Sequence, residues 1–143
     1  MASGALETQG VMLEIGDGGG PETFFEVGEV TDFTGPGGSA AVIDVTHLKS
    51  TAKEKRMGLP DEGQFTFNVN LVPLDNGQRH AFKSRADRRL TNFRLTLTDS
   101  PATVLTFPGF VLEFSLSGAV DDKIPAAITI EISGAVAGFP APV

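Results

Sequence analysis

The 143-residue sequence contains no cysteine, no tryptophan and no tyrosine. The lack of cysteine excludes a disulfide framework, a thiolate metal site and a cysteine nucleophile. Tryptophan and tyrosine are the aromatic side chains that most often serve sugar-binding modules and platforms for stacked bases. Their absence therefore weakens both of these interpretations.

The sequence also lacks the segments that mark membrane insertion or export. No apolar run reaches the roughly 18 residues that a membrane-spanning helix needs. The N-terminus has no basic stretch followed by an apolar stretch, so it is not expected to be a signal peptide. We therefore expect no membrane insertion by this chain.

Residues typical of catalytic, phosphate-binding or metal-binding sites are scarce. Histidine occurs twice, at His47 and His80, and no GxSxG motif accompanies them. The glycine-rich run at residues 16–20 is not followed by the Lys-Ser/Thr pair of a phosphate-binding loop, so we interpret it as a hairpin turn. The acidic residues do not have EF-hand spacing. The sequence therefore predicts no catalytic residue, no metal site and no cofactor.

Charge is distributed unevenly behind the net value of −7. Residues 1–48 carry eight acids and no lysine or arginine, residues 49–94 carry ten bases and five acids, and residues 95–143 carry five acids and one base. One interpretation is that the fold brings these segments together and the charges neutralise within one subunit. The other is a self-complementary particle, because head-to-tail association uses two different patches of the same chain.

Alternating apolar and polar residues dominate the chain, which is typical of antiparallel sheets with one wet face. The alternation is clearest at residues 64–71, 92–98, 110–117 and 128–133. Earlier strands are expected at residues 11–15, 23–30 and 41–48, with a short one at 103–107. In the stretch 110–117, the expected apolar face consists of Phe110, Leu112, Phe114 and Leu116. Gly and Pro at 108–109 are expected to separate this strand from the preceding one.

One amphipathic helix is expected at residues 79–90. Asp75 followed three residues later by Gln78 resembles a capping box. Phe82, Ala86 and Leu90 recur at helical spacing and would form a thin apolar stripe. Three stretches are not expected to form sheet: a polar leader at residues 1–10, a long charged loop at 49–63 and an apolar tail at 135–143. The predicted fold is a single, mainly β domain, an antiparallel sandwich or barrel with one flanking helix.

The polar faces of the later strands carry small neutral residues and a few acids. Glu113, Ser115, Thr129 and Glu131 belong to this set. An ordinary solvated sheet face is one interpretation. The other is a face that lines an aqueous passage from which a polyanion would be repelled, because affinity for phosphate comes from lysine and arginine.

The layout of the whole chain resembles the major tail tube proteins of long-tailed bacteriophages with flexible, non-contractile tails. The resemblance covers about residues 10–134. It is carried by VMLEIGDG, by FFEVGEVTDFTGPGG, by the strand–charged loop–strand block AVIDVTHLKSTAKEKRMGLPDEGQFTFNVNLVP, by the helix–strand RHAFKSRADRRLTNFRLTLTD and by the closing FPGFVLEFSLSGAVDDKIPAAITIEISG. Puncturing tubes of contractile tails and of type VI secretion share this fold.

The resemblance implies a structural virion protein that self-assembles into hexameric rings. These would stack into the hollow tail tube through which double-stranded DNA passes. Its implied partners are further copies of the chain and the tail terminator, tape measure and tail tip proteins, with assembly in the host cytoplasm. A secretion-type tube and a ligand- or carbohydrate-binding β-sandwich are the alternatives.

The resemblance also assigns roles to segments. Residues 1–10 would be an N-terminal arm, 49–63 a loop that reaches the adjacent ring, and 135–143 a C-terminal arm. The expected inter-ring residues are the loop bases and a set of acids that receive them: Lys49, Lys53, Lys55 and Arg56, with Glu22, Glu26, Glu29 and Asp32. The expected lumen-lining residues are Glu113, Glu131, Ser115 and Thr129.

Overall fold

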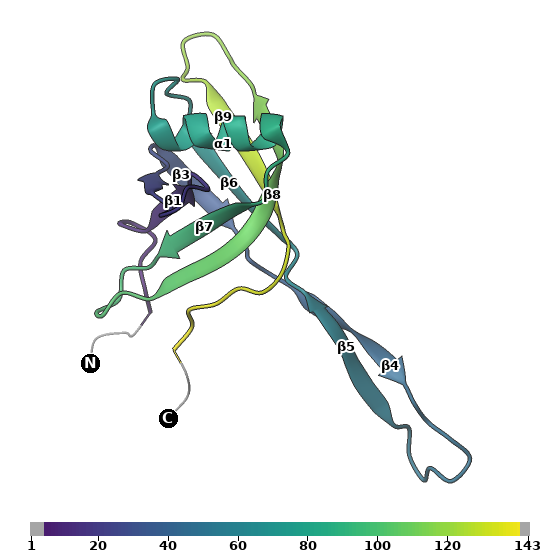
Figure 1. The fold of residues 1–143 in the computed structure, drawn as a ribbon. Coiled ribbons are helices and arrows are strands. Elements are labelled where there is room, and N and C mark those ends of the chain that lie inside the picture. The colour runs from purple at the N-terminus through teal and green to yellow at the C-terminus, as the bar shows by residue number, and fades with distance from the viewer. Residues whose placement is uncertain (1–4, 141–143) are drawn as a thin grey trace.

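The computed structural model describes residues 5–140 and builds them from nine strands and one helix (Figure 1). In chain order the elements are β1 (Met12–Gly16), β2 (Phe24–Glu26), β3 (Val30–Thr34), β4 (Ser39–Asp44), β5 (Lys55–Asp61), β6 (Gln64–Asn70), α1 (Asn76–Asp87), β7 (Thr91–Thr96), β8 (Val104–Leu116) and β9 (Pro125–Ile132).

Seven strands form one curved antiparallel sheet in the order β2-β1-β7-β8-β9-β6-β3. The mainly β prediction with one helix is confirmed, but the sheet does not close into a barrel. The remaining two strands, β4 and β5, pair only with each other. They form a ribbon that leaves the body at the end opposite α1 (Figure 1).

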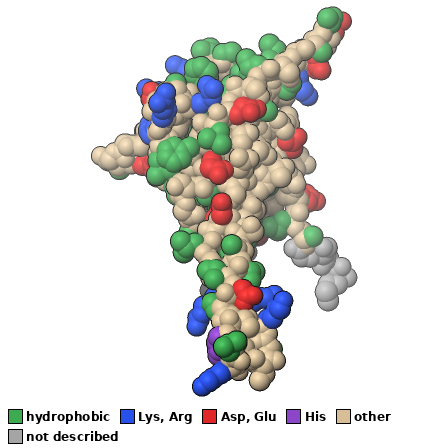
Figure 2. Space-filling view, turned by 90° about the vertical axis from the view of Figure 1, so that its right-hand side faces the viewer, with side chains coloured by type: hydrophobic (Ala, Val, Ile, Leu, Met, Phe, Trp, Pro, Cys, Tyr) green, Lys and Arg blue, Asp and Glu red, His purple; other side chains and the backbone are tan. Residues whose placement is uncertain are grey.

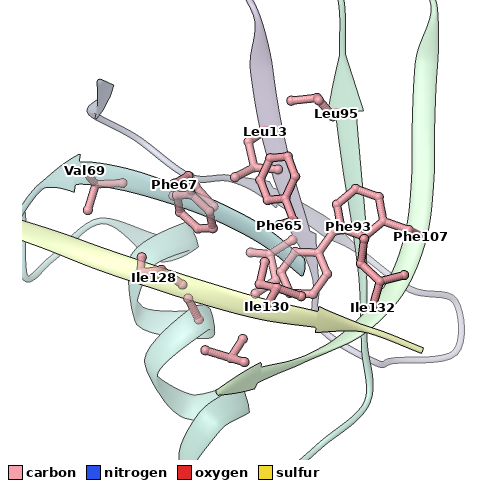
Figure 3. Close-up of a cluster of buried hydrophobic side chains, with 14 of the residues drawn as sticks. Leu13, Phe65, Phe67, Val69, Phe93, Leu95, Phe107, Ile128, Ile130 and Ile132 are labelled. Atoms are coloured by element: carbon pink, nitrogen blue, oxygen red, sulfur yellow. The ribbon is translucent and has the colours of Figure 1, made fainter. Parts of the chain in front are cut away.

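The core lies in the concavity of this sheet and is rich in phenylalanine (Figure 3). Phe65 packs against Phe67 and Phe107, with ring centroids 5.9 and 5.3 Å apart. Phe93 stacks on Phe107 at 5.7 Å. Alternate residues of β6 and β9 supply much of the rest, as the period-2 pattern predicts. Burial of these large side chains stabilises the fold, because removing apolar area from water is the main favourable term in folding.

Strand β8 runs unbroken through Pro108 and Gly109, where the sequence predicts a break between two strands. A bulge between Val111 and Glu113 then changes its alternation. Before the bulge, the residues that face the core are Leu105, Phe107 and Val111. The prediction that Phe110 and Leu112 share a buried face is therefore wrong, since both are exposed. Phe114 returns to the edge of the core beyond the bulge.

Helix α1 begins three residues earlier than predicted and buries a different face. Asp75 is the N-cap and accepts a hydrogen bond from the Gln78 N–H, as predicted. The predicted stripe of Phe82, Ala86 and Leu90 is exposed. The buried face is instead small and polar: Gly77, Gln78, Ala81 and Ser84. Small side chains let the helix approach the sheet closely, and a Cβ at Gly77 would lie 2.3 Å from the Glu26 carbonyl oxygen.

Two further boundaries differ from prediction. The strand expected at 23–30 is two strands, because the chain turns at Glu29, whose φ is 61°. The long loop expected at 49–63 is shorter. Residues 55–61 form β5 and pair with β4, which itself ends at Asp44 rather than at 48. Cross-strand pairs such as Val42 with Met57 hold this ribbon together.

Of the expected terminal arms, residues 1–4 and 141–143 lie outside the described residues. Within the described part, Ala137 forms an antiparallel bridge with Thr106, so the tail continues along β8. No helix in residues 5–140 is long and apolar enough to cross a membrane.

Replacing Gln78 with Ala is expected to destabilise the fold. Its side chain is 2% exposed, accepts from the Val72 N–H at 2.9 Å and donates to the Gly28 and Asn70 carbonyls at 2.9 and 3.1 Å. Groups left buried without partners cost about 1–3 kcal/mol of unfolding free energy. Urea unfolding of the monomer measures this. The neighbouring exposed Arg79→Ala should change the value by less than about 0.5 kcal/mol, and equal losses in both variants would contradict the assignment.

Candidate functional site: a projecting arm, a polar sheet face and unpaired strand edges

The arm, residues 39–61, is a two-stranded ribbon with a connecting loop at its tip. At roughly 3.4 Å per residue its strands extend about 20 Å from the body. A cross-strand pair of residues Val42 and Met57 lies on one face, and the next pair on that face is Asp44 with Lys55. An isolated two-stranded ribbon is marginally stable in water. Contact with another surface would therefore stabilise an arm of this kind.

All four bases predicted for inter-ring contact lie on this arm and are exposed: Lys49, Lys53, Lys55 and Arg56. Figure 2 shows Lys and Arg side chains gathered over it. Within residues 5–140 none of the four forms an intrachain ion pair. The loop is organised instead by His47 and Glu54, whose Nε2 and Oε2 are 3.2 Å apart. Hydrogen bonds from the Thr46 hydroxyl and N–H hold the pKa of Asp44 below its usual value.

The four predicted receiving acids do not form one cluster. Glu22 accepts hydrogen bonds from the Gly18 N–H and from Asn92. Glu26 lies on the edge strand β2, and Glu29 lies at the turn that leads into β3. Asp32, on β3, accepts from Asn68 Nδ2 at 2.6 Å. Glu26 and Glu29 are exposed and have no ion-pair partner in the described part of the chain.

The four predicted lumen residues do lie together. Register pairs Glu113 of β8 with Thr129 of β9, and the next residues on the same face are Ser115 and Glu131. Ser115 Oγ donates to Glu113 Oε1 at 3.0 Å. The face continues across β6 and β3 through Thr66 and other polar residues that alternate with the core positions. We call this surface the polar face: it is the side of β3, β6, β9 and residues 110–116 that points away from the core. It carries no lysine or arginine.

Unpaired strand edges are the feature that sequence patterns do not show. Strand β8 pairs with β7 only over Val104–Gly109, whereas it pairs with β9 over Gly109–Leu116. Residues 110–116, the distal part of β8, therefore have a strand on one side only. The Ser117 N–H donates to Pro125 O on the β9 side, so by alternation Leu116 directs its N–H away from β9. Strand β3 is the sheet's outer edge on the other side of β6.

Charge is poorly neutralised within the chain. Among the described residues, one ion pair joins the acidic N-terminal segment to the basic middle: Arg94 donates to both carboxylate oxygens of Glu14, at 3.0 and 2.9 Å. The hydrogen bond to Glu14 raises the pKa of Arg94. Within residues 5–140, no group of three or more His, Asp or Glu side chains is placed to hold a metal ion.

A polar sheet face and a projecting charged segment are the features that the sequence resemblance leads one to expect. A sequence profile of the family described as phage tail tube, TTP, lambda-like matches residues 4–102, more than half of the chain. The chain belongs to the lambda-like phage tail tube protein family. No curated protein matches it in a direct sequence search.

Solved structures of similar fold are tails and injection tubes. The tail of a gene transfer agent particle, refined with C6 symmetry, is 14% identical, with a TM-score of 0.74 and coverage of 95% of this chain and 100% of that one. The SPP1 tail tube is 9% identical, with a TM-score of 0.68, covering 94% and 80%. The sheath/tube terminator of an extracellular contractile injection system is 11% identical, with a TM-score of 0.72, covering 98% and 100%.

Family membership gives this tail tube protein a structural role in a tube, with a place in the virion tail. The family consists of structural proteins, not enzymes. The family match therefore favours a tube-forming role over the ligand-binding β-sandwich that the sequence alone left open as an alternative.

Trypsin should cut the soluble monomer first within the arm. Its bases are exposed on a thin ribbon and loop, where local opening is easy, whereas the exposed arginines of α1 are held in a helix and act as an internal control. Mass spectrometry of the earliest fragments should find cleavage after Lys49, Lys53, Lys55 or Arg56 with the rest of the chain intact. Earliest cleavage in α1 would contradict this description of the arm.

Proposed function

We propose that this tail tube protein forms hexameric rings that stack into a hollow tube through which double-stranded DNA passes. The observation that carries the proposal is the pair of unpaired strand edges on one curved sheet. Residues 110–116 and β3 lie at the two sides of the segment distal β8-β9-β6-β3. If the distal β8 of one copy pairs with β3 of the next, backbone groups on both edges gain partners and the ring closes without a free edge. The C6 symmetry of the similar gene transfer agent tail supports six copies.

Closing the ring in this way turns the polar face inward. Glu113, Glu131, Ser115 and Thr129 would then line the lumen, with Asp32 on the same face of β3. Like charge repels DNA phosphates, and a surface without lysine or arginine offers no site for counterion release. DNA would therefore slide through the tube rather than bind to it.

The arm would connect successive rings. It projects from one end of the body and exposes four bases without intrachain partners. We assign Lys49, Lys53, Lys55 and Arg56 to contact with acids of the adjacent ring. Each exposed pair is worth about 0.2–1 kcal/mol, so apolar contacts must supply most of the binding energy.

Further partners follow from a tube of this kind. Its two ends would meet tail terminator and tail tip proteins, its lumen would hold the tape measure protein during assembly, and assembly would take place in the host cytoplasm. A tube with another cargo is the second candidate, since the fold also matches an extracellular contractile injection system. The match to a phage family favours DNA as the cargo.

Reversing three arm charges together, with Lys53→Glu, Lys55→Glu and Arg56→Glu, should block tube growth. The side chains lie on the arm, away from the core, so the monomer should stay folded with unchanged circular dichroism. Negative-stain microscopy at physiological salt should show tubes from the unaltered protein and none from the variant. The matched control Lys53→Arg, Lys55→Arg and Arg56→Lys keeps the charge and should form tubes. If the reversed variant forms normal tubes, the arm bases do not take part in the inter-ring contact.

The lumen assignment can be tested by thiol labelling, because the chain has no native cysteine. In assembled tubes, Ser115→Cys should react with a small maleimide and resist one attached to a large polyethylene glycol that cannot enter the tube. Thr106→Cys is the control, because Thr106 is exposed on the proximal part of β8. It should react with both reagents. Equal reaction of Ser115→Cys with both reagents in intact tubes would place the polar face outside.

A further inference from the structure

An apolar groove lies between α1 and the distal part of β8. It has a volume of about 500 Å³ and is lined by Leu71, Val72, Pro73, Gln78, Phe82 and Leu116, with Phe114 at its floor and Arg79 and Lys83 at its rim. Phe82 stands edge-on to Phe114 with ring centroids 5.6 Å apart, yet 56% of Phe82 is exposed. Figure 2 shows apolar side chains beside basic ones over this upper part of the body. Contiguous exposed apolar surface of this kind marks an interaction site.

The arm also carries exposed apolar side chains. Leu48 at its tip is fully exposed, Leu59 is 93% exposed and Met57 is 75% exposed. Met57 and Val42 form a cross-strand pair, and Leu59 lies two residues farther along the same strand. Nothing in the described chain covers these side chains. The ion pairs assigned to the arm cannot do so, because they involve its charged residues only.

The two apolar surfaces lie at opposite ends of the molecule. Figure 1 shows α1 and the end of β8 at one end and the arm leaving from the other. A chain cannot bring its own arm into its own groove in this arrangement, but a second copy stacked in the same orientation can. Such a contact uses two different patches of the chain, as ring closure through β8 and β3 also does. Because the arm and the groove lie at opposite ends of the body, copies joined through them follow one another end to end, as copies in successive rings do. It fits stacking of rings, not closure of a ring.

We propose that the α1–β8 groove receives the arm of a copy in the adjacent ring, with the tip residue Leu48 seated against Phe82. This inference rests on the proposed stacking of rings and names the surface that receives the arm. The contact is apolar in character.

Asp44, on the same face of the arm as Val42 and Met57, can pair with Arg79, which has no ion-pair partner in the described chain. The Thr46 N–H donates to Asp44 at 2.9 Å, and hydrogen bonds from Thr46 hold the pKa of this carboxyl below its usual value. The cross-strand neighbour of Asp44, Lys55, has the same sign as the rim, so apolar area and not net charge holds the arm in the groove.

This apolar receiver differs from the four acids that the sequence suggests for the arm bases, Glu22, Glu26, Glu29 and Asp32. Those acids are spread over two strands and two connecting segments, and two of them already accept hydrogen bonds within the chain. The groove, in contrast, offers the apolar area that an inter-ring contact needs. Salt concentration distinguishes the two receiving surfaces. At about 1 M the Debye length falls to about 3 Å, so contacts between exposed charges are screened and apolar contacts are not. Tubes held by the groove should persist at this salt concentration.

The test is a disulfide between Leu48→Cys and Phe82→Cys in the same chain, oxidised after assembly. Each copy would give one bond and receive one, so a non-reducing gel should show a ladder of multimers. A disulfide requires Cα atoms within about 7 Å, so a ladder reports direct seating. If Phe82→Cys disturbs folding, the pair Leu48→Cys with Lys83→Cys, at the rim of the groove, replaces it in the same test. The control pair Leu48→Cys with Thr106→Cys should give none.

Three outcomes are possible. Tubes in the microscope with a ladder from the groove pair alone support the inference. Tubes without that ladder from either groove pair, or with an equal ladder from the control pair, overturn the inference and leave the proposed function standing. Absence of tubes from the unaltered protein overturns the proposed function, and the inference with it.

Discussion

The structure depends on how the backbone hydrogen bonds of β8 are shared. Over Val104–Gly109 this strand lies between β7 and the chain that follows β9, but over 110–116 it has β9 on one side only. The bulge between Val111 and Glu113 lies where the partner changes, and Gly109 leaves the space that Ile130 needs. A strand that serves two parts of one sheet bends the sheet around its phenylalanine core and leaves half of its own edge open.

The open edge explains the other unusual surfaces. The segment formed by distal β8, β9, β6 and β3 has no neighbouring strand on either side, so it is a template for further copies. Its polar, base-free face would become an inner wall when copies join. The uneven charge along the sequence has the same origin. Little of it is neutralised inside the chain, where Arg94 and Glu14 form the one ion pair between the acidic and basic segments of the described residues. The remainder is available for contact between copies.

Much of the fold follows from the alternation of residues, because burial on one face of a strand fixes which side chains point inward. This holds for β6, β7 and β9. It fails at β8, because a bulge shifts the alternation without leaving a mark in the sequence, so simple alternation assigns Phe110 and Leu112 to the wrong face. It fails again at α1, where Gly77 and Gln78 determine the buried face through close approach and hydrogen bonds. Parity does predict that Glu113, Ser115, Thr129 and Glu131 share one face, and the register of β8 and β9 places them there. The open edge and the groove arise from contacts between distant segments and have no local pattern.

The central claim is that copies join through the open edges of this sheet with the polar face inward. Helical reconstruction by electron cryo-microscopy of assembled tubes tests it most directly. We predict a continuous inner sheet in which residues 110–116 of one copy hydrogen-bond to β3 of the next, with Glu113 and Thr129 at the lumen. A tube in which these edges stay unpaired, or in which the polar face lies outside, would contradict the account.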